Sequence, residues 1–336
     1  MLVLTLDSYR DRRVNISQAA LEGRGMEVST ITNSSRRTIN LVAGLATAAL
    51  AGASATHAQP AALEPGQGKE ALMSPPAIGQ GSYASVNGLK MYYEVHGSGR
   101  PLVLLHGAFG TAESWAGVLP RLAQTRKVII LEQQGHGHTA DRDAPLAYEQ
   151  MADDTAALLK HLNATGADIF GYSLGGIVAL GVAIRHPEVV GRLAVLGANS
   201  GRLKDTFEPE SYAQFLGIPA DFAPEMLKLP YDRVAPDKTK WPVLVRKIKE
   251  LGRDFEGYPT EDVRSIKAPT LIMLGDREGV RPEHAVEMFR TIPSAQLAVF
   301  PAGDHFLLFT NPEKVLGTLV AFLDAPASAP KKDDSK

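Results

Sequence analysis

The strongest chemical signal in the sequence is the segment Gly171-Tyr172-Ser173-Leu174-Gly175-Gly176. It follows the short segment Asp168-Ile-Phe170, which predicts a strand, and it opens a mostly apolar stretch that predicts a helix. Glycines two positions before and two positions after Ser173 permit a sharp strand-to-helix turn, because side chains there would collide with neighbouring elements. Such a turn exposes the serine hydroxyl in front of the positive end of a helix dipole. We therefore predict that Ser173 is a nucleophile.

A serine nucleophile needs a base, and the base needs an acid that orients it. The sequence has nine histidines, and His305 is the one that lies in a polar turn between the last predicted strand and the last predicted helix. Two acid candidates, Asp276 and Glu278, follow the predicted strand 270–274. The residue types alone leave both open as the partner of His305.

The segments around these residues alternate between short apolar runs and longer stretches with helical spacing. Predicted strands cover 83–86, 89–95, 102–105, 128–131, 168–170, 193–196, 270–274 and 296–300, and predicted helices cover 114–123, 148–162, 175–186, 282–289 and 312–323. Asn87-Gly88 predicts a hairpin turn between the first two strands. The alternation predicts an α/β fold with a mostly parallel central sheet flanked by helices.

The stretch from about residue 199 to residue 262 breaks this alternation, with scattered proline, glycine and aromatic residues. A long insertion in a compact domain is typical of a lid or binding element. We predict a small, mostly helical cap inserted after the sixth strand.

Together with the serine segment, His106-Gly107-Ala108-Phe109-Gly110 after a buried strand resembles the α/β-hydrolase superfamily, from about residue 81 to residue 323. The resemblance implies the α/β-hydrolase fold and an oxyanion hole formed by the N–H groups of Ala108 and Leu174. Such donors stabilise the tetrahedral oxyanion more than the ground-state carbonyl. It also implies a structural role for His106.

The resemblance also bears on the acid. The superfamily pattern Gly-x-x-Asp-x-x-x-Pro places Glu278 at the acid position, where this sequence departs from the usual aspartate. Glu278 is therefore favoured, and Asp276 remains the competitor because it lies nearer the strand end. His305 matches the superfamily's catalytic histidine by its order and context, which implies that it is the base of Ser173. The chain order is then serine, acid, histidine, as the fold expects.

The loop 132–139 matches the superfamily's loop after the fourth strand, with Glu132 where an aspartate is usual. His136 and His138 lie in this loop, but two histidines without a third ligand nearby are weak grounds for a metal site. We expect no metal and no cofactor.

The resemblance implies a serine hydrolase that cleaves a carboxylic ester of a small to medium hydrophobic substrate through an acyl-enzyme. Alternatives are a lactonase or a carbon–carbon bond hydrolase with the same triad, or, in another class, a non-catalytic ligand-binding protein of this fold. Superfamily members that use an aspartate nucleophile are disfavoured by Ser173.

Composition restricts the partners. The chain has 336 residues, 44% hydrophobic and 21% charged, with a net charge of −2 and no cysteine. We expect a small-molecule substrate and no nucleic-acid partner. The lack of cysteine excludes disulfides and a thiol nucleophile.

The N-terminal region predicts export. A basic start with Arg36-Arg37, the uncharged run 41–55 and small residues at Thr56-His57-Ala58 are typical of a signal peptide, and the paired arginines resemble a twin-arginine signal. We expect a periplasmic or secreted protein without a membrane span after cleavage. The predicted organisation is an extension and signal peptide (1–58), a linker (59–80), a hydrolase domain (81–324, cap about 199–262) and a disordered tail (325–336).

Overall fold

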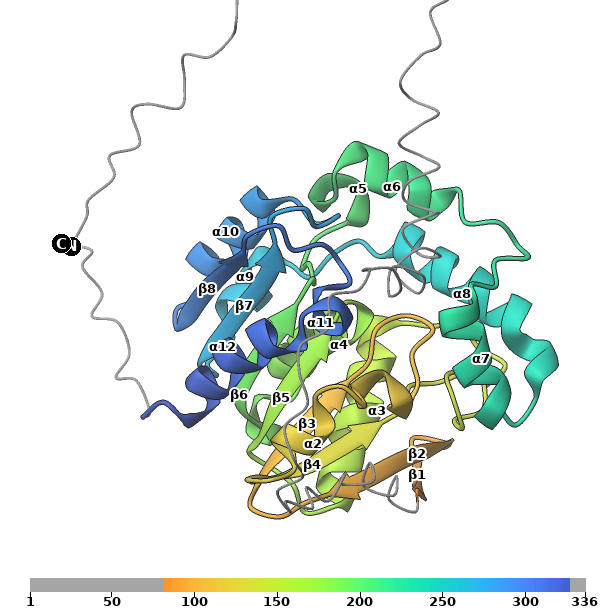
Figure 1. Ribbon diagram of the computed structural model, residues 1–336, viewed down its shortest axis with the longest axis horizontal. Helices are drawn as coiled ribbons and strands as arrows, with labels where there is room; N and C mark the ends of the chain where they lie inside the picture. The colour runs from red at the N-terminus through yellow and green to blue at the C-terminus, as the bar shows by residue number, and fades with distance from the viewer. Residues whose placement is uncertain (1–80, 327–336) are drawn as a thin grey trace, which may run out of the picture. The chain divides into compact units, whose positions relative to one another are not determined.

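The computed structural model describes residues 81–326 (Figure 1). The predicted signal peptide (1–58), the predicted linker (59–80) and residues 327–336 of the predicted tail lie outside the described residues. Export and the boundaries of these segments therefore stay predictions.

One sheet of eight strands forms the centre of the described residues (Figure 1), in the order β1-β2-β4-β3-β5-β6-β7-β8. Strands β1 and β2 form an antiparallel hairpin, β2 pairs antiparallel with β4, and all pairs from β4 to β8 are parallel. This confirms the predicted mostly parallel sheet. The strands are β1 (Ser82–Val86), β2 (Leu89–His96), β3 (Arg100–Leu105), β4 (Arg126–Leu131), β5 (Ala167–Tyr172), β6 (Val190–Leu196), β7 (Thr270–Gly275) and β8 (Ala295–Phe300).

The central strands are buried on both faces, which explains their uninterrupted apolar runs. On β3, Val103 and Leu105 belong to one core cluster, whereas Leu102 and Leu104 belong to the other. Successive side chains of a strand point to opposite faces, so each run supplies both cores. The sheet is therefore covered by helices on each side.

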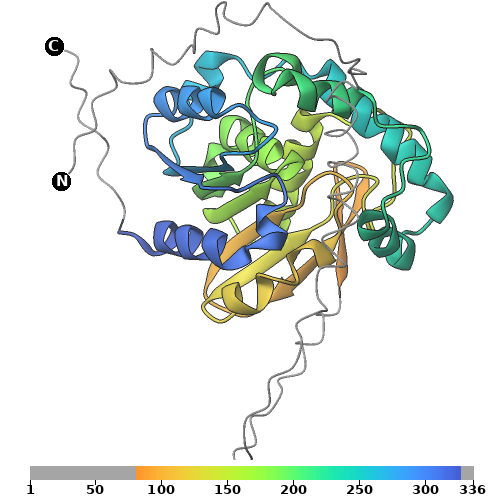
Figure 2. The ribbon, with the colours of Figure 1, turned by 45° about the horizontal axis from the view of Figure 1, so that its top comes forward.

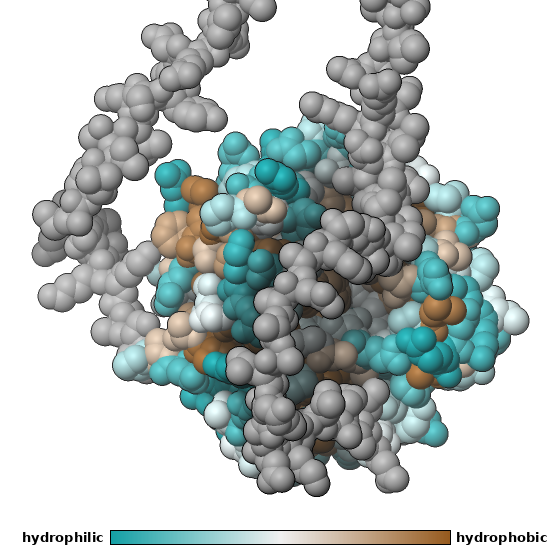
Figure 3. All heavy atoms as spheres, viewed as in Figure 1, coloured by the Kyte–Doolittle hydropathy of each residue, from teal (hydrophilic) through white to brown (hydrophobic). Residues whose placement is uncertain are grey.

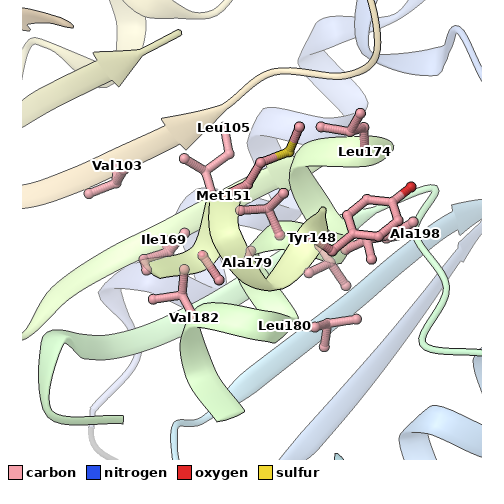
Figure 4. Packing of buried hydrophobic residues seen from close by; sticks show 14 of the residues in the cluster. Val103, Leu105, Tyr148, Met151, Ile169, Leu174, Ala179, Leu180, Val182 and Ala198 are labelled. Carbon is pink, nitrogen blue, oxygen red and sulfur yellow. The ribbon is translucent and has the colours of Figure 1, made fainter. Parts of the chain in front are cut away.

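The first core packs against helices α3 (Tyr148–His161), α4 (Leu174–Arg185), α9 (Thr260–Arg264) and α10 (Pro282–Thr291). Figure 4 shows this packing, with Met151 of α3 next to Leu105 of β3 and Ala179 of α4 next to Ile169 of β5. The second core packs against α2 (Leu119–Leu122), α11 (Leu307–Thr310) and α12 (Pro312–Asp324). Both layers required by the predicted α/β fold are present.

The cap lies between β6 and β7, as predicted. It contains α5 (Leu203–Thr206), α6 (Pro209–Leu216), α7 (Glu225–Val234) and α8 (Trp241–Asp254), which lie next to one another in green to teal in Figure 2. The predicted end of the cap at about 262 falls inside α9, a helix that contacts α4 and α10. Helix α9 therefore packs on the sheet-covering layer.

One predicted helix differs in the structure. Residues 114–123 do not form a single helix but the 3₁₀-helix η2 (Ala112–Trp115) and the short α2, which begins at Leu119. Pro120 is the reason, because a continuous helix would place its ring against the carbonyl of residue 116 and remove one helical hydrogen bond. In α2, Pro120 lies in the first turn, where its missing N–H costs nothing.

The surface of the described residues mixes hydrophobic and hydrophilic side chains. Figure 3 shows hydrophobic residues interspersed with hydrophilic ones on the face in view. Large apolar side chains with the greatest exposure are Tyr83, Val95, Leu216, Met226, Leu229, Val299 and Phe309. Among residues 81–326, no helix has the length and apolarity needed to cross a membrane.

A buried ion-pair network lies at the end of the sheet that is remote from Ser173. The carboxylate of Asp168 on β5 is fully buried and accepts hydrogen bonds from Arg100 (2.8 Å) and Arg126 (3.0 Å). Arg126, itself only 5% exposed, also pairs with Asp324 at the end of α12. The network joins three central strands to the last helix.

Replacement of Asp168 by asparagine should destabilise the protein, because Arg126 would keep its charge while losing a buried counter-charge. We expect a loss of about 3 kcal/mol in the free energy of unfolding, measured by urea denaturation. The matched control is Asp254→Asn, which breaks a pair with Arg253 on the exposed surface and should leave the stability unchanged. Equal effects of the two substitutions would contradict this role of Asp168.

Candidate active site

A strained turn between β5 and α4 holds Ser173. The residue has φ 53° and ψ −122°, and helix α4 begins directly after it at Leu174. A Cβ at Gly171 would lie 2.3 Å from the carbonyl oxygen of Gly175, and a Cβ at Gly175 would lie 2.0 Å from that of Leu105. Only glycine fits these two positions, so the sequence dictates the sharp turn. The turn leaves the Ser173 side chain partly exposed.

Three side chains from separate loops form a hydrogen-bonded chain. Nε2 of His305 lies 3.0 Å from Oγ of Ser173, and Nδ1 of His305 lies 2.7 Å from Oε1 of Glu278. An ionised carboxylate only accepts hydrogen bonds, so Nδ1–H donates to Glu278 and Nε2 is left as the acceptor for the serine hydroxyl. The arrangement can remove the Ser173 proton when the hydroxyl attacks an electrophile.

The charges around these three side chains favour proton transfer from Ser173 to the imidazole of His305. Burial lowers the pKa of His305, but attraction to Glu278 and the hydrogen bond between them outweigh it, so that the pKa is raised above its ordinary value. Burial raises the pKa of Glu278, but the charge and hydrogen bond of His305 and the amides of Gly279 and Val280 outweigh it and lower the pKa. Glu278 therefore stays ionised beside an imidazole that accepts a proton readily.

The two acid candidates lie in different surroundings. Glu278 is buried, and its Oε1 also accepts a hydrogen bond from the N–H of Gly279 at 2.8 Å. Asp276 is exposed directly after β7, where its backbone N–H donates to the carbonyl oxygen of Phe300. The structure thus brings Glu278, and not Asp276, to His305.

The loop after β3 and the first residue of α4 lie beside the serine. The loop after β3 turns tightly, with the N–H of Gly110 donating to Gly107 at 3.0 Å, and a Cβ at Gly107 would lie 3.2 Å from Cβ of Ser173. Leu174 occupies the first position of α4, where the N–H has no partner within the helix. Within residues 81–326, neither Ala108 nor Leu174 donates its N–H to an acceptor. Both donors are available to a bound oxyanion.

Buried side chains hold the loop that carries Ala108. His106 is fully buried; its Nδ1 lies 2.8 Å from the carbonyl oxygen of Gly107, and its Nε2 accepts from the N–H of Gln133 at 3.1 Å. Burial lowers its pKa and keeps it neutral. The buried carboxylate of Glu132 accepts from the N–H of Ala112 at 2.8 Å. The loops after β3 and β4 are therefore tied together.

The histidines of the β4 loop have structural partners. Nδ1 of His136 lies 3.0 Å from the carbonyl oxygen of Gln134, and burial lowers its pKa to about 3. Nδ1 of His138 lies 3.0 Å from Glu132, and its ring stacks on Tyr92. In the part of the chain that the structure describes, no group of three histidine, cysteine or acidic side chains could hold a metal ion.

Two contacts at the site were not predicted. The hydroxyl of Tyr172 donates to the backbone carbonyl oxygen of His305 at 2.8 Å and fixes the histidine loop to the end of β5. Phe109, with φ 65°, packs its ring against Phe222 and Trp241 of the cap. Both contacts join segments far apart in the sequence, so no local pattern predicts them. The only hint in the sequence is that Tyr172 directly precedes Ser173.

Comparison with known proteins places this chain and its fold in one family. The profile of the alpha/beta hydrolase family matches residues 102–318. A 2-hydroxy-6-oxo-6-(2'-aminophenyl)hexa-2,4-dienoic acid hydrolase of Metapseudomonas resinovorans is 26% identical over 269 residues, which cover 73% of this chain and 91% of that protein. An sn-1-specific diacylglycerol lipase of Danio rerio is 24% identical over 278 residues, covering 73% and 86%.

Solved structures agree on the fold. The structure of a meta-cleavage product hydrolase of Pseudomonas fluorescens superposes with a TM-score of 0.60 at 22% identity, covering 73% of this chain and 97% of the other. The family profile spans most of the described residues, including the serine turn, Glu278 and His305. The chain belongs to the alpha/beta hydrolase family.

Proposed function

We propose that the protein is a serine hydrolase that cleaves carboxylic esters of small to medium hydrophobic substrates. The observation that carries the proposal is the hydrogen-bonded chain from Ser173 through His305 to the buried carboxylate of Glu278, with distances of 3.0 and 2.7 Å. A serine with an oriented base and two nearby backbone donors is suited to acyl transfer.

In the proposed reaction, Oγ of Ser173 attacks the ester carbonyl carbon while Nε2 of His305 takes the hydroxyl proton. The N–H groups of Ala108 and Leu174 stabilise the oxyanion of the tetrahedral intermediate. His305 then protonates the leaving alcohol as the carbon–oxygen bond breaks, which leaves an acyl-enzyme. Water attacks this ester with His305 as base, and the acid product and free Ser173 are released.

The preference for a hydrophobic substrate rests on the cap. The cap contributes partly buried apolar side chains that pack against the core cluster containing Leu174, namely Phe207, Tyr212, Phe215, Ile218, Phe222 and Leu227. Apolar surroundings favour an acyl or aryl group over a charged one. The lipase relative of Danio rerio acts on a hydrophobic ester, which is consistent with this proposal.

A carbon–carbon bond hydrolase is the second candidate. The substrate in the name of the Metapseudomonas relative carries ketone and carboxylic acid groups but no ester, so its hydrolysis must break a carbon–carbon bond. The same serine, histidine and acid can serve that reaction. A lactone, being a cyclic ester, falls within the first candidate's chemistry.

Hydrolysis of p-nitrophenyl esters from acetate to palmitate tests the first candidate. We expect turnover by the wild-type protein with an optimum at short to medium acyl length, and a loss of roughly 10⁴-fold or more in Ser173→Ala and in His305→Ala. A folded wild-type protein that cleaves no ester of the series, but does cleave a 2-hydroxy-6-oxo-dienoic acid, would replace the first candidate by the second.

Substitution of the two acid candidates tests the role of Glu278. Glu278→Gln should lower kcat by roughly 10³-fold or more, because an amide cannot hold the Nδ1–H tautomer or stabilise the imidazolium. Asp276→Asn, the matched control on the same loop, should change kcat by about twofold or less, as for other surface substitutions. The reverse order of effects would make Asp276 the acid.

The pH dependence of kcat/KM tests the electrostatics. His305 must be neutral to accept the serine proton, and its pKa is raised, so activity should fall as the pH drops through a value above about 6.5. In Glu278→Gln the attraction is lost, and the acidic limb of the residual activity should move to lower pH. An unmoved limb would show that Glu278 does not set the pKa of His305; Asp276→Asn is the control.

A further inference from the structure

The turn after β6 lies close to the carboxylate of Glu278. Gly197 follows the last residue of β6, has φ 60° and is buried, and its N–H donates to the carbonyl oxygen of Met273 on β7 at 3.0 Å. Its Cα therefore has a fixed position between β6 and the loop that carries Glu278. No residue of this turn belongs to the hydrogen-bonded chain itself.

A side chain at this position would meet the acid and the base together. A Cβ at Gly197 would lie 2.8 Å from Oε2 of Glu278, 3.2 Å from Nδ1 of His305 and 3.4 Å from its Cε1. A separation under 3.0 Å forces one of the atoms to move. The missing side chain thus faces the hydrogen bond between Glu278 and His305.

The carboxylate of Glu278 has little freedom to yield. Its side chain is only 2% exposed, and Oε1 is held at 2.7 Å from Nδ1 of His305 and 2.8 Å from the N–H of Gly279. Any rotation that moved Oε2 away from residue 197 would also turn Oε1 out of line with both partners. A methyl group at residue 197 would therefore act on the geometry of the base.

We propose that Gly197 is a positioning residue that provides the space a glutamate needs to serve as the acid in this protein. The inference rests on the proposed function and deepens it, because it couples the size of residue 197 to the length of residue 278. Glu278 is one methylene longer than an aspartate at the same backbone position. The extra length brings the carboxylate against the Cα of Gly197, where any other residue would obstruct it.

The test combines Gly197→Ala with Glu278→Asp in the full chain. The readouts are the rate of covalent labelling of Ser173 by a fluorophosphonate and kcat on the best p-nitrophenyl ester. Gly197→Ala should slow both by about 100-fold, the effect of a misplacement of about 1 Å at a reacting group. In the Glu278→Asp background, which already has a slower rate, the same substitution should have an effect of about threefold or less, because the shorter carboxylate leaves room for the methyl group.

Backbone strain needs its own control, since alanine at positive φ is strained wherever it lies. Gly166 has φ 74°, and a Cβ there would meet nothing within 4 Å, so Gly166→Ala reports strain without a collision. Gly166→Ala should leave labelling and kcat unchanged. A Gly197→Ala rate equal to that of Gly166→Ala would overturn the inference, and so would equal effects of Gly197→Ala in the two backgrounds.

The pH profile separates a positioning role from a general structural one. A displaced Glu278 attracts His305 less, so the acidic limb of kcat/KM should move to lower pH in Gly197→Ala, while Asp304 and Tyr172 near the ring are unchanged. A lower rate with an unmoved acidic limb would overturn the inference.

Should Gly197→Ala fail to fold, recovery of the fold by added Glu278→Asp supports the inference, and failure of the double variant to fold overturns it. Absence of labelling in the wild-type protein would instead refute the proposed serine hydrolase.

Discussion

The close approach of the β5–α4 turn to β3 is the constraint on which the site depends. No side chain fits at Gly171 or Gly175, because the backbone atoms of Gly175 and Leu105 occupy the space. The helix can therefore start immediately after Ser173 and lie against the sheet. The same contact places the start of α4 next to the end of β3, so one steric condition positions both Ser173 and the first amide of the helix.

Parallel strands bring the remaining groups to the same edge of the sheet. Ser173 follows β5, Glu278 follows β7 and His305 follows β8, and all three strands run in one direction. Their carboxyl ends therefore converge, although Ser173 lies more than a hundred positions before both Glu278 and His305 in the sequence. The buried network of Asp168 lies on β5 at the opposite end, so stability and chemistry use different ends of the same strand.

The sequence was sufficient to predict the fold, since uninterrupted apolar runs and helical spacing report burial on two faces directly. It also indicated Ser173 and His305 as candidates from local motifs, and the structure brings their side chains together. The roles of Ala108 and Leu174 come from the resemblance to the superfamily and stay predictions. The residue types left Glu278 and Asp276 open, and the spacing of the superfamily pattern favoured Glu278. The burial of Glu278 and its contact with His305 depend on how the loop after β7 folds, which the sequence does not show. The break in the helix predicted over 114–123 followed from Pro120, whose effect depends on its position within a turn.

Two contacts at the site could not be predicted for a different reason. Tyr172 reaches His305 across the sheet edge, and Phe109 reaches Trp241 in the cap, so both depend on the arrangement of segments that no local pattern describes. Gly197 has no side chain, so nothing in the sequence marks it as part of the site. Such residues are recognised only when the space around them is known.

The backbone of Ser173 itself has a further consequence. Its φ of 53° lies in the left-handed region that a residue with a side chain adopts at a cost of about 1–3 kcal/mol. A glycine at this one position would adopt the same φ without this cost, yet it would remove the hydroxyl. The proposed nucleophile is thus also a point of backbone strain, and the surrounding fold must be stable enough to maintain it. Evolution toward greater thermal stability and evolution toward faster turnover would place opposing demands on this single residue.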